Sequence, residues 1–330
     1  MRATSPRCGT ALLLTILMLS SVFALAVSSL SDSPVEEPAP SSDEVVLNQA
    51  QKDAISKVIG RSSTTNWVKS AGPDSNTING PGALNAVHFE AMSMDHTGTY
   101  VLLAGTLRGE VRFDSIQPPP QDGPRVFVAK MTTSGVWLWV SISEVAMGST
   151  GGAVLSDIAV SSTGDIFVTG MFWFDIIWGN DFALSSSASI DGFVAKMSSS
   201  GSWIWGTEMG GVDDEDSMNG IVVDSNGDVY VVGVFYDHAY FGNISMNRQK
   251  ALDGFVTKVD KATGNYSWVN VFGGNQNDNA SSIAIDSNDR LFITGYYQGD
   301  ITFGNNTLLN AGAPSAFVCE LDVNGSWVWS

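Results

Sequence analysis

Short runs of alternating apolar and polar residues, separated by polar turns, recur along most of the chain. The clearest example is Asp191–Trp205, in which an alternating run, a turn containing Gly201 and a tryptophan-rich second run follow one another. Alternation with a period of two on both sides of a short glycine-containing connection predicts a β-hairpin. Three further segments repeat this arrangement: 125–139, 253–268 and 315–329. Four copies of one hairpin indicate a fold built from repeats.

The spacing of the copies is regular, because three landmark residues keep the same register. The hairpin tryptophans Trp139, Trp205, Trp268 and Trp329 are separated by 66, 63 and 61 residues. The phenylalanines Phe127, Phe193, Phe255 and Phe317 are separated by 66, 62 and 62. The glycines Gly105, Gly170, Gly233 and Gly295 are separated by 65, 63 and 62. A repeat array with a period of about 62–66 residues is therefore predicted from Asn66 onward.

A second hairpin precedes the tryptophan hairpin in each unit. Its two alternating runs flank a turn that starts with Asp or Ser and usually has Gly three positions later. An Asp side chain can accept backbone N–H bonds within such a turn, and Gly supplies the positive φ. We therefore expect Asp95, Asp224 and Asp286 to stabilise turns rather than to bind a ligand.

Each unit thus has two hairpins and one short strand-like run that ends in an aromatic residue, as at Phe241. No helical segment separates these strands, so the pattern predicts antiparallel four-stranded sheets. Radial repetition of such sheets is a β-propeller. The sequence therefore predicts an all-β fold, a β-propeller of about four four-stranded antiparallel blades. Its units are longer than the roughly 40–50 residues of common blade families, and the excess lies in polar loops.

The repeated Gly-Phe-Val hairpin, followed by Gly-Gly and an Asp-containing second hairpin, resembles the SBBP-type β-propeller repeat. The resemblance covers about Asn66–Ser330 and is clearest over 192–211 and 254–274. It implies a propeller fold and a secreted or surface protein of bacteria or archaea, and it carries no catalytic residues to transfer. Two departures are evident. The family is associated with seven blades whereas four units occur here, and the first unit has Arg125-Val126 in place of Asp-Gly.

The ends of the array leave two arrangements open. Trp67 precedes Gly72 by five residues, as Trp205 precedes Gly210, so the segment 66–72 repeats an outer strand of the array. Such a strand could complete the last blade, close a four-bladed ring and remove unpaired sheet edges. The alternative is that the chain is a piece of a longer array.

The first 60 residues have a different character. Residues 1–26 combine an early positive charge, an apolar core and small residues at 24–26, which predicts a secretory signal peptide; an uncleaved membrane anchor is the alternative. Residues 27–44 form a linker rich in Pro, Ser and acidic residues. Residues 45–60 have apolar positions at helical spacing and predict a short amphipathic helix. The protein is therefore expected to be secreted or on the cell surface.

Net charge limits the classes of binding partner, and cysteine content limits the possible disulfides. The 330-residue chain has 34 acidic and 16 basic residues and a formal net charge of −18. This negative charge would repel the phosphates of nucleic acid, which excludes nucleic acid as a partner. It would also repel anionic membrane surfaces, so contact with a membrane is expected only if the N-terminal segment stays uncleaved. The two cysteines allow no disulfide framework: Cys8 lies in the signal segment, and Cys319 is expected to be a small buried residue.

Two sets of polar residues are candidates for binding. Asp213, Asp214 and Asp216 form an acidic loop that could supply oxygen ligands to Ca²⁺, the one cofactor the sequence suggests; a solvated acidic loop is the alternative. The second set occupies equivalent positions three residues before the short-strand aromatic and, if it faced the axis, would form a ring able to bind a cation or a hydroxylated ligand. The alternative is that these residues cap strands. The members of this set are Glu110, Asp175, His238 and Asp300.

Catalytic motifs are not found. The three histidines lie in no metal-binding or nucleophile-activating arrangement, and no nucleophile elbow, phosphate loop or dinucleotide fingerprint occurs. Six tryptophans lie in Trp-x-Trp pairs, where alternation would place both members of a pair on one face, as expected for packing rather than sugar stacking.

Secretion would make the five Asn-x-Ser/Thr sequences candidate glycosylation sites. Their asparagines are Asn243, Asn265, Asn279, Asn305 and Asn324. The sequence as a whole favours an extracellular binding or scaffold protein that recognises a protein or a glycan through its blade loops. A hydrolase or lyase acting on polysaccharide, and a purely structural repeat protein, are the alternatives.

Overall fold

The computed structural model describes residue 71 and residues 85–145, 150–179, 182–211, 216–310 and 312–330. These all belong to the second of two compact units, Ser63–Ser330. Within the described ranges the chain forms strands, turns and loops and contains no helix, so none that could cross a membrane. The predicted signal peptide (1–26), linker (27–44) and amphipathic helix (45–60) lie outside the described residues.

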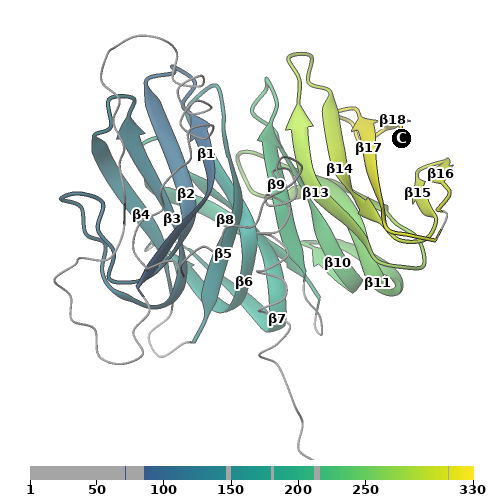
Figure 1. Cartoon of the computed structure of the whole chain (residues 1–330), viewed down its shortest axis with the longest axis horizontal. Helices are drawn as coiled ribbons and strands as arrows, with labels where there is room; N and C mark the ends of the chain where they lie inside the picture. Colours follow the sequence, from purple (N-terminus) through teal and green to yellow (C-terminus); the bar gives the residue numbers. More distant parts are fainter. Residues whose placement is uncertain (1–70, 72–84, 146–149, 180–181, 212–215, 311) are drawn as a thin grey trace, which may run out of the picture. The chain divides into compact units, whose positions relative to one another are not determined.

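Four antiparallel four-stranded blades follow one another in chain order (Figure 1). The first contains β1 (Ala86–Met94), β2 (Tyr100–Gly109), β3 (Gln121–Thr132) and β4 (Trp137–Val145). The second contains β5 (Gly152–Val160), β6 (Ile166–Trp178), β7 (Phe182–Met197) and β8 (Trp203–Gly210). The third contains β9 (Ser217–Val223), β10 (Val229–Phe241), β11 (Ile244–Val259) and β12 (Tyr266–Phe272). The fourth contains β13 (Asp278–Ile285), β14 (Leu291–Tyr297), β17 (Ser315–Leu321) and β18 (Trp327–Trp329), with the hairpin β15 (Ile301–Phe303) and β16 (Asn306–Leu308) inserted.

The predicted Asp turns join the first and second strands of three blades. One carboxylate oxygen of Asp224 accepts the backbone N–H groups of Asn226 and Asp228 at 2.9 and 2.8 Å. Asp95 and Asp286 bind the backbone of their own turns in the same way. The side chain thus satisfies backbone donors that the tight turn leaves without a strand partner, which confirms the predicted turn role.

The repeated glycine of the second strand is required by a close approach of the first strand. At Gly233, a Cβ atom would lie 2.0 Å from the carbonyl oxygen of Ser217, and the other three landmark glycines face a carbonyl oxygen at 1.8–2.1 Å. The pairing register of the first two strands also shifts beside each of these glycines. The first strand therefore bulges toward the second, and only a residue without a side chain leaves room for it.

The short strand-like run predicted as a separate element is, in the second and third blades, a continuation of a longer strand. β6 and β10 pass through a bulge at Phe174 and Asp237, where φ is 57° and 56°, and then continue to Trp178 and Phe241. Only in the fourth blade is this run a separate strand, β15. The extension beyond the bulge pairs with the outer strand of the preceding blade: β4 pairs with β6, and β8 pairs with β10.

The prediction that both tryptophans of a Trp-x-Trp pair share one face is wrong. Trp203 packs in the core between the first and second blades, whereas Trp205 packs in the core between the second and third. The consecutive residues Lys196 and Met197 of β7 pair with Trp205 and Trp203, so β8 carries one extra residue at this point. This bulge turns one indole to the opposite side of the sheet. Both are buried, as the packing role requires.

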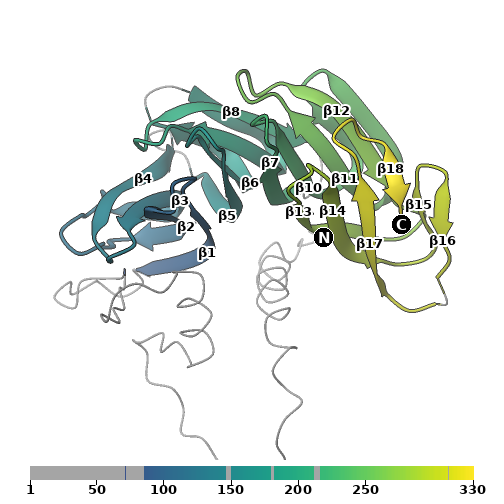
Figure 2. The same ribbon diagram turned by 90° about the horizontal axis from the view of Figure 1, so that it is seen from above.

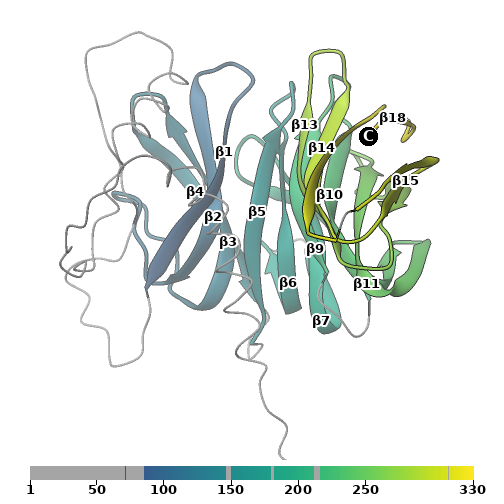
Figure 3. The ribbon, with the colours of Figure 1, turned by 45° about the vertical axis from the view of Figure 1, so that its right-hand side comes forward.

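Neighbouring blades share three hydrophobic cores, each formed by the far face of one blade and the near face of the next. The first strands of the blades, β1, β5, β9 and β13, contact one another in order along one side of the array (Figures 1 and 3). Within this unit, Figure 2 shows the four blades side by side along an arc. Each blade is therefore held by its neighbour mainly through apolar packing.

Closure of a ring is not seen in the described residues, where no strand pairing joins the fourth blade to the first. The predicted closing segment 66–72 lies outside the described residues except for Ala71, which packs against the core of the first blade. Ala71 occupies the repeat position of Met209, and Met209 packs against the blade that follows it. Ala71 therefore keeps the repeat pattern, but closure by this segment remains a prediction.

Candidate functional site

A partly open pocket of about 440 Å³ lies where the second blade meets the third. The start of β7, the middle of β8 and the extension of β10 form its walls. Glycines at 206, 210, 211 and 242 line much of it, so backbone rather than side chains forms part of its surface. The remaining lining residues are Leu184, Ser185, Asp191, Thr207, Glu208 and Tyr240.

Tyr240 supplies an exposed aromatic ring at this pocket, since half of its side chain is accessible to solvent (50%). The ring of His238 packs edge-on against it with 4.4 Å between centroids, and a nitrogen of that imidazole lies 3.0 Å from the hydroxyl of Ser245. Both side chains come from the extension of β10 beyond its bulge. Pairing of Tyr240 with Gly210 of β8 holds this extension beside the second blade.

Glu208 and Asp191 bring two carboxyl groups to the pocket. A carboxylate oxygen of Glu208 accepts the backbone N–H of Ser185 at 3.2 Å. Burial raises the pKa of Glu208, and this hydrogen bond offsets only part of that effect. Asp191 is almost fully buried and lies against Gly210. The pocket therefore combines hydrogen-bonding acids with one exposed aromatic ring, a composition suited to a small hydroxylated ligand.

A smaller adjacent hollow of about 250 Å³ shares Thr207 and Gly242 with this pocket. Asn243 and Asn265, two of the predicted glycosylation sites, line it and are exposed. Asn305 and Asn324 are also exposed in turns, whereas Asn279 is half-buried in β13. Exposure is a precondition for glycan attachment, and four of the five asparagines meet it.

The four residues predicted to form a ring each follow a residue with positive φ, namely Gly109, Phe174, Asp237 or Gly299. The side-chain hydrogen bonds of three of these residues are formed with partners in the same blade. The Glu110 carboxylate accepts a hydrogen bond from the Gln117 side-chain amide, and the Asp300 carboxylate accepts one from the backbone N–H of Asn310. The His238 imidazole forms a hydrogen bond with the Ser245 hydroxyl. In the described part of the chain, no group of three or more His, Cys, Asp or Glu residues is placed to hold a metal ion. The structure does not bring Glu110, Asp175, His238 and Asp300 together as such a group.

The predicted calcium loop is described only at Asp216. Its two carboxylate oxygens accept the backbone N–H groups of Gly211 and Tyr236 at 2.7 and 3.0 Å, and the residue is fully buried. Asp278 makes the same pair of bonds one repeat later. Asp216 therefore has a structural role that the array repeats. Asp213 and Asp214 lie outside the described residues, and calcium binding there stays a prediction.

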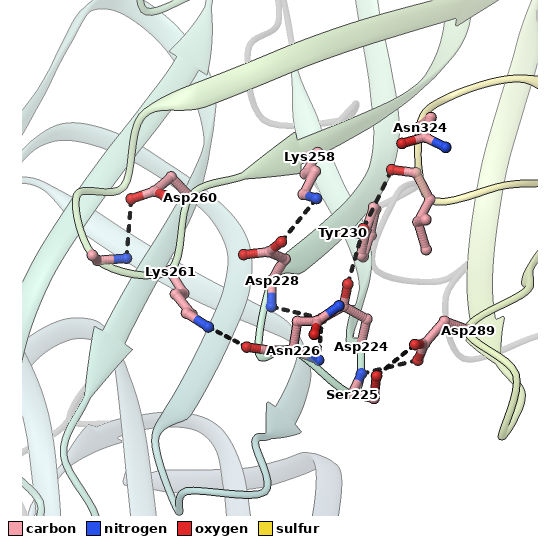
Figure 4. Close-up of polar contacts among 12 residues, drawn as sticks. Asp224, Ser225, Asn226, Asp228, Tyr230, Lys258, Asp260, Lys261, Asp289 and Asn324 are labelled. Atoms are coloured by element: carbon pink, nitrogen blue, oxygen red, sulfur yellow. Dashed lines mark hydrogen bonds and ion pairs between the residues drawn. The ribbon is translucent and has the colours of Figure 1, made fainter.

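The turns at one end of the third and fourth blades form a second polar cluster (Figure 4). The N–H and hydroxyl of Ser225 both donate to the carboxylate of Asp289 in the next blade, at 2.9 and 2.6 Å. The hydroxyl of Tyr230 donates to Asp224, and Lys261 donates to the carbonyl oxygen of Asn226. The Ser225–Asp289 bonds cross the blade junction, whereas the other two lie within the third blade, so the cluster joins the blades and stabilises their turns.

Sequence reasoning overlooked Glu208 and Tyr240, although a comparison of the repeat units contains a signal for both. Glu208 pairs with the landmark phenylalanine of the second blade, Phe193. In the first and third blades the residues that pair with the equivalent phenylalanine are apolar, Ile142 and Val271. A charged residue at an otherwise apolar repeat position indicates a local function or a local change in exposure. Tyr240 replaces the Ile, Arg and Thr found at its repeat position in the other units.

Comparison with known proteins supports the repeat assignment. Residues 204–234, from β8 to β10, match the family model of the SBBP β-propeller repeat, which confirms the resemblance seen in the sequence. No curated protein matches the chain. Among solved structures, the chain is similar to a protein of unknown function from Bacteroides caccae, with 11% identity, 74% of this chain and 81% of that chain covered, and a TM-score of 0.30.

Proposed function

We propose that this chain is a secreted or cell-surface binding protein in which β-propeller repeats form a rigid scaffold, and that the pocket beside Tyr240 binds a sugar residue of a glycan. The observation that carries the proposal is the exposed Tyr240 ring next to Glu208 and Asp191 in a glycine-lined hollow. The apparent signal segment at 1–26 and the resemblance to SBBP repeats support an extracellular location.

The chemistry of the pocket fits a sugar better than an apolar or an anionic ligand. A sugar ring presents C–H groups on one face, which pack on an aromatic ring, and hydroxyl groups at its rim, which donate to carboxylates. The half-buried backbone of Gly206, Gly210 and Gly211 forms part of the pocket surface, where peptide groups can bind hydroxyl groups. An anionic ligand would be repelled by Asp191, by ionised Glu208 and by the acidic chain as a whole.

The raised pKa of Glu208 adds a second property. Its side chain stays protonated up to a higher pH than that of an exposed glutamate, and the protonated form can donate as well as accept a hydrogen bond. Binding of a hydroxylated ligand is therefore expected to vary with pH near the titration of this group, and Glu208→Gln should bind with little pH dependence.

A glycan-array screen tests the proposal, using protein made in a host without N-glycosylation so that Asn243 and Asn265 stay unmodified. We expect reproducible binding to one sugar class, at least a tenfold loss of affinity in Tyr240→Ala, and near-normal binding in Tyr240→Phe, which keeps the ring. A tenfold change corresponds to about 1.4 kcal/mol. Repeating the screen with Ca²⁺ and with chelator tests the acidic loop.

Absence of binding by folded wild-type protein, or equal binding by Tyr240→Ala, would overturn the proposal. Shortened glycans released from the same probes would instead support a polysaccharide hydrolase or lyase, for which the carboxyl groups of Asp191 and Glu208 would be the first residues to replace.

A further inference from the structure

The pocket beside Tyr240 continues into the smaller hollow next to it. Thr207 of β8 and Gly242, in the turn between β10 and β11, line both hollows, so the two meet at these residues. The larger hollow contains the Tyr240 ring, whereas the smaller one is lined by Asn243 and Asn265. A ligand longer than one sugar residue can therefore occupy both hollows at once.

The smaller hollow has a different chemistry from the larger one. Two acids, Asp191 and Glu208, line the larger hollow, whereas the described lining of the smaller one includes no acidic residue, lysine, arginine or histidine. Its polar side chains at the surface include the amides of Asn243 and Asn265, both of which are exposed. An amide side chain can donate and accept hydrogen bonds, as a sugar hydroxyl group requires. The smaller hollow is therefore suited to an uncharged sugar residue.

Neither of the two amides is used to hold the fold together. Within the part of the chain that the structure describes, only backbone groups of Asn265 form hydrogen bonds: its N–H donates to the hydroxyl of Thr263, and its carbonyl oxygen accepts the N–H of Asp260. The side-chain amides of Asn243 and Asn265 bond no other described protein group. Both amides can therefore turn toward a ligand without breaking a contact of the fold.

The wall between the two hollows is fixed by contacts from the third blade to the second. The hydroxyl of Tyr266, at the start of β12, donates to the backbone carbonyl oxygen of Glu208 at 3.0 Å. The completely buried Phe241 packs edge-on against the Tyr266 ring, with 5.5 Å between centroids. Because Tyr240 precedes Phe241 in the same strand, this packing also holds Tyr240 in place. A cleft with fixed walls loses little conformational entropy when a ligand binds.

From this arrangement we infer that the two hollows are adjacent subsites of one cleft, which binds two neighbouring residues of an uncharged oligosaccharide. One sugar residue packs on the Tyr240 ring, and the next lies against the amides of Asn243 and Asn265. The inference rests on the proposed function of the pocket and extends it from a single sugar to a chain. A monosaccharide makes only the contacts of one subsite, so it binds more weakly than a disaccharide.

Isothermal titration calorimetry with probes of increasing length tests this inference. The protein is the full chain, made in a host without N-glycosylation, so that both asparagines stay unmodified. The probes are the monosaccharide, disaccharide and tetrasaccharide of the cello-, manno-, xylo- and chito-oligosaccharide series. In one series we expect at least a tenfold gain in affinity from the monosaccharide to the disaccharide, and less than about a threefold further gain for the tetrasaccharide.

Variants separate the contributions of the two subsites. Asn243→Ala and Asn265→Ala should each weaken binding of the disaccharide at least threefold and leave binding of the monosaccharide unchanged, whereas Tyr240→Ala should weaken both. Asn305→Ala is the matched control: Asn305 follows Phe-Gly in the fourth blade as Asn243 does in the third, and it is exposed but lines neither hollow. This variant should bind both probes normally. Circular dichroism establishes that each variant is folded.

Two kinds of result would overturn the inference and still leave the proposed function standing. The first is equal affinity for the monosaccharide and the disaccharide, with both lost in Tyr240→Ala. The second is a disaccharide affinity that Asn243→Ala and Asn265→Ala change no more than Asn305→Ala does. Absence of binding by all the probes would also overturn the inference, whereas the glycan array decides the proposed function separately.

Discussion

Arg290 and Glu320 of the fourth blade form an ion pair, with 4.0 Å between guanidinium and carboxylate, whose charges are reversed relative to the two preceding blades. At the same two positions the third blade has Asp228 and Lys258, 2.8 Å apart, and the second has Asp165 and Lys196, 2.9 Å apart. The two positions keep opposite charges, but the acidic and the basic residue exchange places in the fourth blade. Three of the four blades therefore have an ion pair at these two positions, in either order.

This relationship predicts that the reversed pair can be transplanted. Lys258→Glu should destabilise the protein by about 1 kcal/mol, because two acids would face each other at a partly exposed site and the ammonium over the Tyr230 ring would be lost. Adding Asp228→Arg should recover most of that loss. Urea unfolding of the single and double variants measures the coupling, and a double variant no more stable than Lys258→Glu would contradict it.

The landmark glycine of the second strand should tolerate no side chain. Gly233→Ala would place Cβ 2.0 Å from the Ser217 carbonyl oxygen, and relief of that clash should cost about 3 kcal/mol in the free energy of unfolding. Gly98→Ala is the control: Gly98 has φ of 67° but no atom near its Cβ position, so only left-handed strain of about 1 kcal/mol is expected. Denaturant unfolding that gives equal losses for the two variants would count against the steric explanation.

Cys319 should be unreactive in the folded protein. It is a free, completely buried thiol, and burial raises its pKa to about 12. Little thiolate forms at pH 8, and reagent cannot reach the sulfur. In a Cys8→Ser background we expect Ellman's reagent to label no thiol under native conditions and one thiol in denaturant. Rapid labelling of the native protein would show that β17 opens readily.

The turn at Asp286 should lose stability in acid. Backbone and side-chain hydrogen bonds from Arg290 lower the pKa of Asp286 to about 2 from its ordinary 3.8. For a lowered carboxyl pKa, the stabilisation is complete above the unfolded value and is lost as pH falls through the folded one. The difference in Tm between wild type and Asp286→Ala should therefore shrink from pH 5 to pH 2.

Ser161 provides the control for this pH dependence. Its hydroxyl occupies the same turn position in the second blade and accepts the N–H of Asp165 at 3.0 Å, but it does not titrate. The difference in Tm between wild type and Ser161→Ala should stay constant over the same pH range. Parallel pH profiles for the two alanine variants would mean that the Asp286 carboxylate charge does not stabilise its turn.

Features that depend on near neighbours were readable from the sequence. Alternating residues around an Asp-started turn predicted the hairpins, and the 62–66-residue period predicted four blades, because strand faces and turn hydrogen bonds are settled by residues a few positions apart. The roles of Asp95, Asp224 and Asp286 were correct for the same reason.

Only the tertiary structure decided how repeat positions differ in their surroundings. A bulge in β8 placed Trp203 and Trp205 on opposite sides of a blade, which simple alternation cannot anticipate. Pairing between blades brought Tyr240 to Glu208, 32 positions apart in the chain. Four valines of the third strands occupy the same repeat position and are indistinguishable in sequence: Val128, Val194, Val256 and Val318. Val318 alone is exposed because burial depends on whether another blade packs against it. Contacts between blades are non-local, so the sequence of one repeat does not show whether another blade packs against it.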